Sequence, residues 1–137
     1  MLNLLFYFSK KLDIALQIIS ELKHLEGLRF DIVGTGYEKE VSKYMDLAGE
    51  LGLGDICEWH GNVSNGKVHE MMRNADVLLF TSIMEATSTV VLESLSNGLP
   101  VVCFDICGFG PIIDSNVGAT VGYTDNAKSV VLFQQKT

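Results

Sequence analysis

Proline, cysteine and basic side chains are all scarce in this sequence, and each shortage excludes a class of protein. The 137 residues include two prolines and 13 glycines, which favours tight loops over extended linkers. The three cysteines, Cys57, Cys103 and Cys107, leave one over in any disulfide pairing, which favours a cytoplasmic location. Ten basic against 17 acidic residues give a net charge of −7. We therefore expect no nucleic-acid partner, because phosphate neutralisation needs clustered Lys and Arg.

Long hydrophobic runs and common nucleotide motifs are also missing. No apolar run reaches the roughly 18 residues of a membrane span. The run 2–8 is too short for a signal peptide, and no basic stretch precedes it. No G-x-x-x-x-G-K-[ST] pattern occurs, which excludes a Walker-type NTPase. With 47% hydrophobic residues, the chain can build one domain that buries roughly two thirds of its unfolded surface.

Short apolar runs alternate with segments of helical periodicity along the chain. We predict strands at 2–8, 28–33, 55–60, 76–80, 99–104 and around 119–121, and helices at 12–22, 38–51, 67–74, 89–97 and 126–135. This alternation predicts an α/β fold with a single, mostly parallel, doubly wound sheet of the Rossmann-like kind. We expect residues 1–137 to form one domain.

A pair of glutamates frames the start of one predicted helix. Ligands of doubly wound sheets bind at the carboxyl ends of the strands. After the strand 76–80, Thr87 and Ser88 are natural N-cap residues, and the helix that they begin offers free N–H groups to a phosphate. Glu85 precedes this helix, and Glu93 lies roughly 7 Å along its axis. Carboxylates on both sides of a phosphate suit a nucleotide sugar, whose hydroxyls donate to them. Alternatively, Glu93 is a solvated helix residue and Glu85 is a loop residue favoured by the helix dipole.

The spacing of these glutamates also resembles a known family motif. Glu85 and Glu93 enclose seven residues, as in the E-x7-E motif of retaining glycosyltransferases with the GT-B fold. Other segments resemble that family in the same order along the chain: 32–36 its hydrophobic-VGxG turn, 60–63 its xGxV strand end, 74–82 its ADV strand, 91–102 its LEAxxxGxPVV segment, and 105–113 its donor-site loop. The set resembles the C-terminal, nucleotide-sugar-binding domain of glycosyltransferase family 4, or group 1.

The resemblance implies a role for each matching residue. Glu93 would hold the ribose hydroxyls, and Glu85 would contact the transferred sugar beside the reacting centre as the catalytic residue. Gly34 and Gly36 would lie beside the nucleotide, and Lys10 or Lys11 would neutralise the diphosphate. Backbone amides would hold the donor sugar and diphosphate along Ala86, Thr87, Ser88, Thr89 and Val90. Two features depart from the family: its members often have glycine where this chain has Ala86 and Ser88, and no arginine accompanies the lysines.

The resemblance further implies an enzyme that transfers a sugar to an acceptor hydroxyl with retained anomeric configuration. The donor would be a UDP-, GDP- or ADP-sugar, with no metal or other cofactor, and polysaccharide biosynthesis is the expected setting. The N-terminal acceptor-binding domain would lie outside these residues, so we expect the chain alone to be inactive. A lipid-linked acceptor would bring the full-length enzyme to the inner face of the membrane.

Two other functions stay open at the level of the sequence. One is a non-catalytic nucleotide-binding module. The other is an NAD-type Rossmann enzyme, although the turn at Gly34 and Gly36 has Lys39 where a third glycine belongs, and it follows the second strand rather than the first. We expect His24 and His69 to be surface residues.

Overall fold

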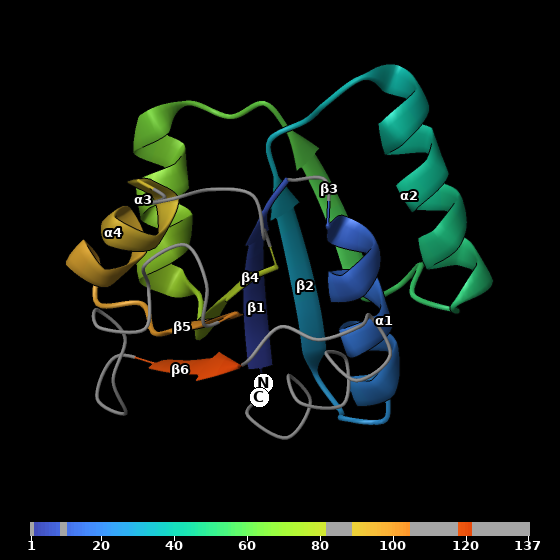
Figure 1. The fold of residues 1–137 in the computed structure, drawn as a ribbon, viewed down its shortest axis with the longest axis horizontal. Helices are drawn as coiled ribbons and strands as arrows, with labels where there is room; N and C mark the ends of the chain where they lie inside the picture. Colours follow the sequence, from blue (N-terminus) through green and yellow to red (C-terminus); the bar gives the residue numbers. More distant parts are fainter. Residues whose placement is uncertain (1, 9–10, 82–88, 105–117, 122–137) are drawn as a thin grey trace.

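Six parallel strands form one sheet in the part of the chain that the structure, a computed structural model, describes: residues 2–8, 11–81, 89–104 and 118–121 (Figure 1). The strands are β1 (Leu2–Tyr7), β2 (Leu28–Val33), β3 (Cys57–Gly61), β4 (Val77–Phe80), β5 (Val101–Phe104) and β6 (Gly118–Val121). The helices are α1 (Leu12–Leu22), α2 (Glu38–Glu50), α3 (Asn65–Asn74) and α4 (Thr89–Ser96). The strand order is β3-β2-β1-β4-β5-β6, and the predicted α/β, doubly wound fold is confirmed.

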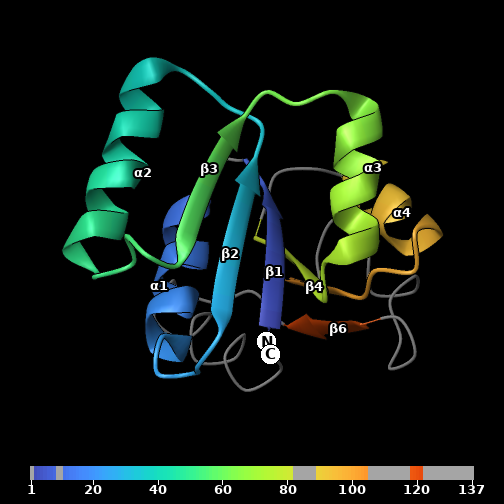
Figure 2. The ribbon, with the colours of Figure 1, turned by 180° about the vertical axis from the view of Figure 1, so that it is seen from behind.

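The two faces of the sheet carry separate hydrophobic clusters. Leu4 and Phe6 of β1 belong to the cluster that contains α1 and α2, whereas Leu5 belongs to the cluster that contains α3 and α4. This division follows from the strand geometry, because successive side chains point to opposite faces. Figures 1 and 2, which view the fold from opposite sides, show α1 and α2 on one side of the sheet and α3 and α4 on the other.

Most element boundaries agree with the predictions within two residues, and the differences have local causes. Helix α3 begins two residues earlier than predicted, where the Ser64 hydroxyl caps it by accepting from the Lys67 amide at 3.2 Å. Strand β5 begins at Val101 because Pro100 has no N–H for the ladder. Helix α4 is followed by Gly98 with φ of 74°, as expected for a glycine C-terminal stop. The predicted helix 126–135 lies outside the described residues.

The order in which strands are added to the sheet changes direction at β1. From β1 it continues to β2 and β3 on one side, and it then returns to place β4 on the other side of β1. The carboxyl ends of β1 and β4 therefore form the topological switch point, where ligands of such folds bind. This is the edge at which the sequence predicts the donor site.

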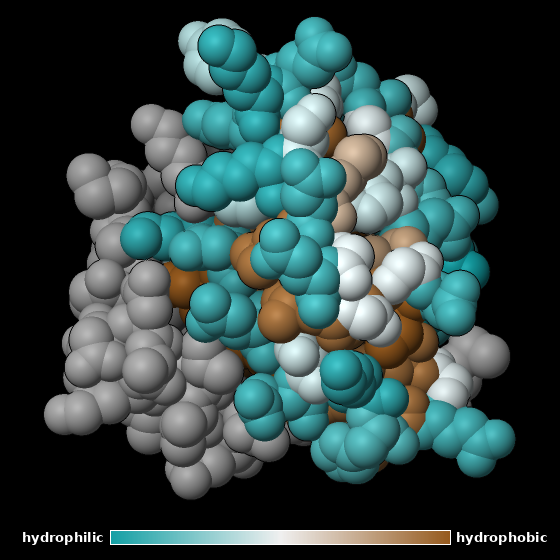
Figure 3. Space-filling view, turned by 90° about the vertical axis from the view of Figure 1, so that its right-hand side faces the viewer, coloured by the Kyte–Doolittle hydropathy of each residue, from teal (hydrophilic) through white to brown (hydrophobic). Residues whose placement is uncertain are grey.

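The described surface is largely hydrophilic on the side of α2. Figure 3 shows this face, in which hydrophilic side chains surround a smaller apolar area. Among the described residues, no helix is both long enough and apolar enough to cross a membrane.

Candidate functional site

A buried hydrogen bond joins the two loops at the switch point. Thr81 directly follows β4 and has no exposed surface. Its hydroxyl donates to the main-chain oxygen of Lys11, 2.6 Å away and 70 residues earlier in the chain. This bond ties the start of the loop that leads to α4 to the residue that precedes α1. Sequence inspection missed Thr81, because no motif or periodicity marks a hydroxyl that acts across 70 residues.

Helix α1 presents its N-terminus at this point. Lys11 is the N-cap residue and makes no side-chain cap, so the first-turn N–H groups lack the partner that a capping side chain supplies. These groups and the helix dipole create a partial positive charge that attracts anions. The Lys11 side chain is half-buried and forms no ion pair with another described residue. The first turn of α1 and the side chain of Lys11 thus both supply positive charge at the switch point.

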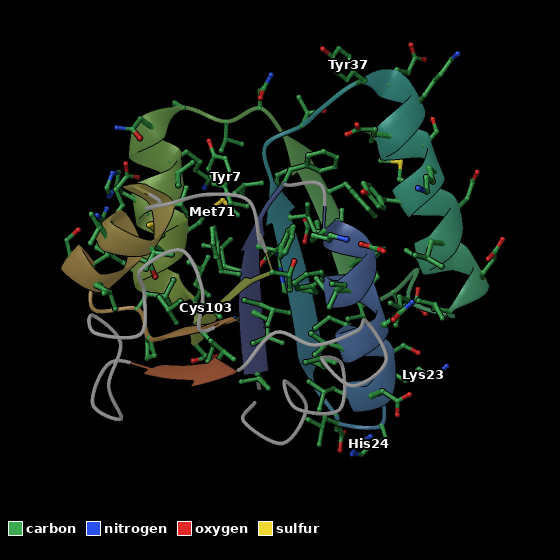
Figure 4. The ribbon with its side chains drawn as sticks, in the orientation of Figure 1. Tyr7, Lys23, His24, Tyr37, Met71 and Cys103 are labelled. Carbon is green, nitrogen blue, oxygen red and sulfur yellow. The ribbon has the colours of Figure 1, made fainter. Side chains whose placement is uncertain are left out.

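The glycine turn after β2 packs closely on the exit of β1. Gly34 has φ of 86°, a conformation that L side chains rarely adopt, and its amide donates to the Gly61 oxygen at 2.8 Å. A Cβ on Gly36 would lie 2.6 Å from Cε1 of Phe8, so only glycine fits without displacing that ring. The turn at Gly34 and Gly36 therefore packs against Phe8, which precedes the two lysines in the sequence. Figure 4 shows Tyr37, 82% exposed, at the outer end of this segment where α2 begins.

Glu93 projects from α4 toward α3. Its carboxylate Oε2 lies 3.7 Å from Nε2 of His69, and the Glu93 side chain is 38% exposed. The Nδ1 atom of His69 is 2.7 Å from the side-chain nitrogen of Asn97. His69 was expected at the surface; it is instead 28% exposed and has two polar partners. The relevant sequence signal was weak, since the partners lie 24 and 28 residues away, one on α4 and one directly after it.

A second polar cluster occupies β2 and β3. Asp31 accepts from Arg29 at 3.0 Å and lies 2.9 Å from Nε2 of His60. Among the described residues, only Asp31, Glu58 and His60 form a group of three potential metal ligands. Arg29 pairs with both carboxylates, and its hydrogen bond to Asp31 raises the pKa of Arg29. The guanidinium of Arg29 already offsets the charge of these two carboxylates, so we assign no metal to the cluster.

The structure describes some of the predicted site residues and not others. Lys10, Glu85, Ala86, Thr87 and Ser88 lie outside the described residues. The described residues Thr89 and Val90 begin α4, and Val90 packs against the hydrophobic cluster on the α3 side. Cys103 is buried, and Cys107 lies outside the described residues.

Strand order, helix placement and the switch point together define a Rossmann-like α/β domain. The glycine turn follows β2, so the first βα turn does not contain the dinucleotide pattern. Residues 6–132 match the family described as "Glycosyl transferases group 1". The chain belongs to this family.

Relatives of known name agree with this membership. The chain is 34% identical over 80 residues to the lipopolysaccharide glucosyltransferase WaaG of Escherichia coli, a match that covers 58% of the chain and 21% of WaaG. It is 29% identical over 118 residues to the phosphatidylinositol N-acetylglucosaminyltransferase gpi3 subunit of Schizosaccharomyces pombe, covering 81% of the chain and 24% of that subunit. The chain thus spans about a quarter or less of the length of these two relatives.

Solved structures show the same fold. The crystal structure of WaaG superposes with a TM-score of 0.79 at 25% identity, covering 98% of this chain and 38% of the WaaG chain. The pneumococcal O-GlcNAc transferase GtfA, solved with UDP and GlcNAc, gives a TM-score of 0.84 at 21% identity, covering 98% of this chain and 28% of GtfA. The GtfA match supports the fold alone.

Proposed function

We propose that this domain binds a nucleoside-diphosphate sugar between the carboxyl ends of β1 and β4 and serves as the donor side of a retaining glycosyl transfer. The Thr81–Lys11 hydrogen bond of 2.6 Å carries the proposal. It brings Lys11 together with Thr81, which lies four residues before Glu85 in the sequence, so both parts of the expected donor site begin at one point. The family membership over residues 6–132 supports the same function.

Each role follows from the chemistry of the donor. Glu93 accepts hydrogen bonds from the ribose hydroxyls, and Lys11 with Lys10 attracts the diphosphate. The backbone amides of residues 86–90 hold the diphosphate and the sugar. Glu85 lies by the transferred sugar. As the glycosidic bond breaks, negative charge develops on the leaving diphosphate, and these positive groups stabilise it without a metal.

The acceptor and the setting are proposed from the relatives. WaaG is named a lipopolysaccharide glucosyltransferase and the gpi3 subunit a phosphatidylinositol N-acetylglucosaminyltransferase. We propose a hydroxyl of a lipid-linked glycan as the acceptor, bound by residues outside these 137 at the cytoplasmic face of a membrane. The 137 residues alone then bind the donor without transferring its sugar.

Calorimetry with UDP, GDP, ADP and NAD tests the donor-binding function. We expect one of the three nucleoside diphosphates to bind more tightly than NAD. Glu93→Ala should weaken that binding about 10- to 100-fold, because hydrogen bonds to a charged group contribute about 1.5–3 kcal/mol. Glu50→Ala, which removes an exposed carboxylate at the end of α2, is the matched control and should have no effect.

Two results would contradict the proposal. A preference for NAD would indicate a dinucleotide enzyme, and equal binding by the Glu93 and Glu50 variants would remove Glu93 from the site. Release of UDP coupled to sugar transfer by the purified 137-residue chain would show that these residues suffice for catalysis.

A further inference from the structure

We propose that His69 is a positioning residue: held by Asn97, it orients the carboxylate of Glu93 toward the ribose hydroxyls of the bound nucleotide. This inference rests on the proposed function, since it gives Glu93 its ribose-binding role. His69 comes from α3 and Glu93 from α4, and Asn97 directly follows the end of α4. Both helices belong to the same face of the sheet.

The hydrogen bonds of Asn97 determine which ring nitrogen of His69 bears hydrogen. The Asn97 side-chain oxygen accepts from Arg73 at 3.4 Å, which places the amide nitrogen on the other side. That nitrogen donates to the main-chain oxygen of Glu93 at 2.8 Å and lies 2.7 Å from Nδ1 of His69. Nδ1 of His69 must therefore be the acceptor. The neutral ring then has its hydrogen on Nε2, the atom that faces Glu93.

Nε2 of His69 and Oε2 of Glu93 are 3.7 Å apart, which is longer than a hydrogen bond, so the N–H of the ring attracts the carboxylate across this gap without bonding to it directly. This contact attracts one carboxylate oxygen toward α3. The other oxygen forms no ion pair or hydrogen bond with a described residue, and the side chain is 38% exposed, so this oxygen can accept from hydroxyls of a ligand. A carboxylate held at one oxygen loses less side-chain entropy on binding than a free one.

The role differs from that of a structural contact in one measurable way. His69 itself does not touch the nucleotide in this arrangement, and its effect passes only through Glu93. Loss of the His69 imidazole should weaken the binding of a nucleotide with ribose hydroxyls and leave the binding of one without them unchanged. In the Glu93→Ala variant, which lacks the carboxylate, loss of the imidazole should cause no further loss of affinity.

The test measures, by calorimetry on the 137-residue chain, the affinities of UDP and of 2′,3′-dideoxy-UDP for wild type, His69→Ala, Glu93→Ala and the double variant. GDP or ADP with its dideoxy form replaces this pair if the first screen selects another base. We expect His69→Ala to weaken UDP binding about threefold to tenfold. It should leave dideoxy-UDP binding unchanged, and it should add nothing to Glu93→Ala.

Control variants separate positioning from folding. His24→Ala removes an exposed histidine near the end of α1, at the lower edge of the view in Figure 4 and away from α3 and α4, and should bind both ligands as wild type does. His69→Gln keeps an N–H near the position of Nε2 and should recover part of the lost affinity. Thermal unfolding of each variant identifies any that fails to fold. If His69→Ala does not fold, the affinities of His69→Gln and His69→Asn for UDP and dideoxy-UDP are compared in its place.

Each outcome decides between the two levels of the proposal. Equal weakening of UDP and dideoxy-UDP by His69→Ala, or no weakening of either, would overturn the positioning role while nucleotide binding stands. An additional loss in the double variant would also overturn it. If wild type binds none of the nucleotides, the proposed function itself fails and the role of His69 fails with it.

Discussion

The buried hydroxyl of Thr81 offers a direct way to separate the stability of the fold from the geometry of the candidate site. Thr81→Val keeps the shape of the side chain and removes the donor to the Lys11 oxygen. Apart from Thr81, the described partner of that oxygen is the Ala15 amide, at 3.5 Å. A buried acceptor left without a good partner costs about 1–3 kcal/mol. We therefore expect the free energy of unfolding to fall by about 2 kcal/mol.

Trp59 supplies the assay for this loss. It is the only tryptophan of the chain, and it packs from β3 against the cluster on the α1 face, so its fluorescence reports unfolding of the sheet. With an m-value of about 2 kcal/mol per molar urea, a loss of 2 kcal/mol moves the midpoint down by about 1 M. The thermal midpoint should fall by about 6 °C.

Thr81→Ser is the matched control. It keeps the hydroxyl and removes one methyl group, which costs about 1 kcal/mol of buried apolar surface. We expect Thr81→Ser to bind UDP as wild type does and Thr81→Val to bind it more weakly, because only valine releases Lys11 from β4. If both variants bind UDP equally, the bond stabilises the fold without shaping the site. If Thr81→Val unfolds at the same urea concentration as wild type, the hydrogen bond makes no net contribution to the free energy of unfolding.

Two further predictions concern glycine and cysteine. Gly36→Ala places a Cβ 2.6 Å from Phe8 and should lower the free energy of unfolding by about 1–3 kcal/mol. Gly49→Ala on α2, where the Cβ meets no atom within 4 Å, should raise it by about 0.5–1 kcal/mol. Urea unfolding followed by Trp59 fluorescence measures both, and a Gly36→Ala variant as stable as wild type would show that the Phe8 ring moves freely. Burial raises the pKa of Cys57 from 9.0 to about 12, so the native state holds this proton more tightly than the unfolded state. Its contribution to stability is complete below pH 9 and is lost as the pH rises toward 12, and Cys57→Ala should flatten the decline of unfolding free energy above pH 9; an unchanged slope would contradict this.

The strands and helices could be predicted from the sequence because each is encoded locally. The alternation of apolar runs with helical periodicity located every element that the structure describes. Errors arose at the ends, where one local group decides the outcome. The hydroxyl of Ser64, for example, starts α3 before its apolar periodicity begins.

The site could be predicted only in part, for a physical reason. Gly34 and Gly36 are recognisable because a glycine turn has a sequence pattern, and Glu93 because of its spacing from Glu85. Thr81 and His69 have no such pattern, because their partners are distant in sequence and common in type. Their contacts form only when the fold brings two distant segments together.

Electrostatics shows why these cross-sheet contacts matter for an acidic domain. The net charge of −7 repels a diphosphate from every direction, but a repulsive charge 20 Å away in water contributes only about 0.2 kcal/mol. An opposite charge about 4 Å from the phosphate, at an effective dielectric constant of 20, contributes about 4 kcal/mol. A few positive groups therefore outweigh the overall charge only while they stay within a few ångströms of the ligand. In the proposed donor site, the bond from Thr81 keeps them close by fixing the main chain of Lys11 and the start of α1 beside the carboxyl end of β4.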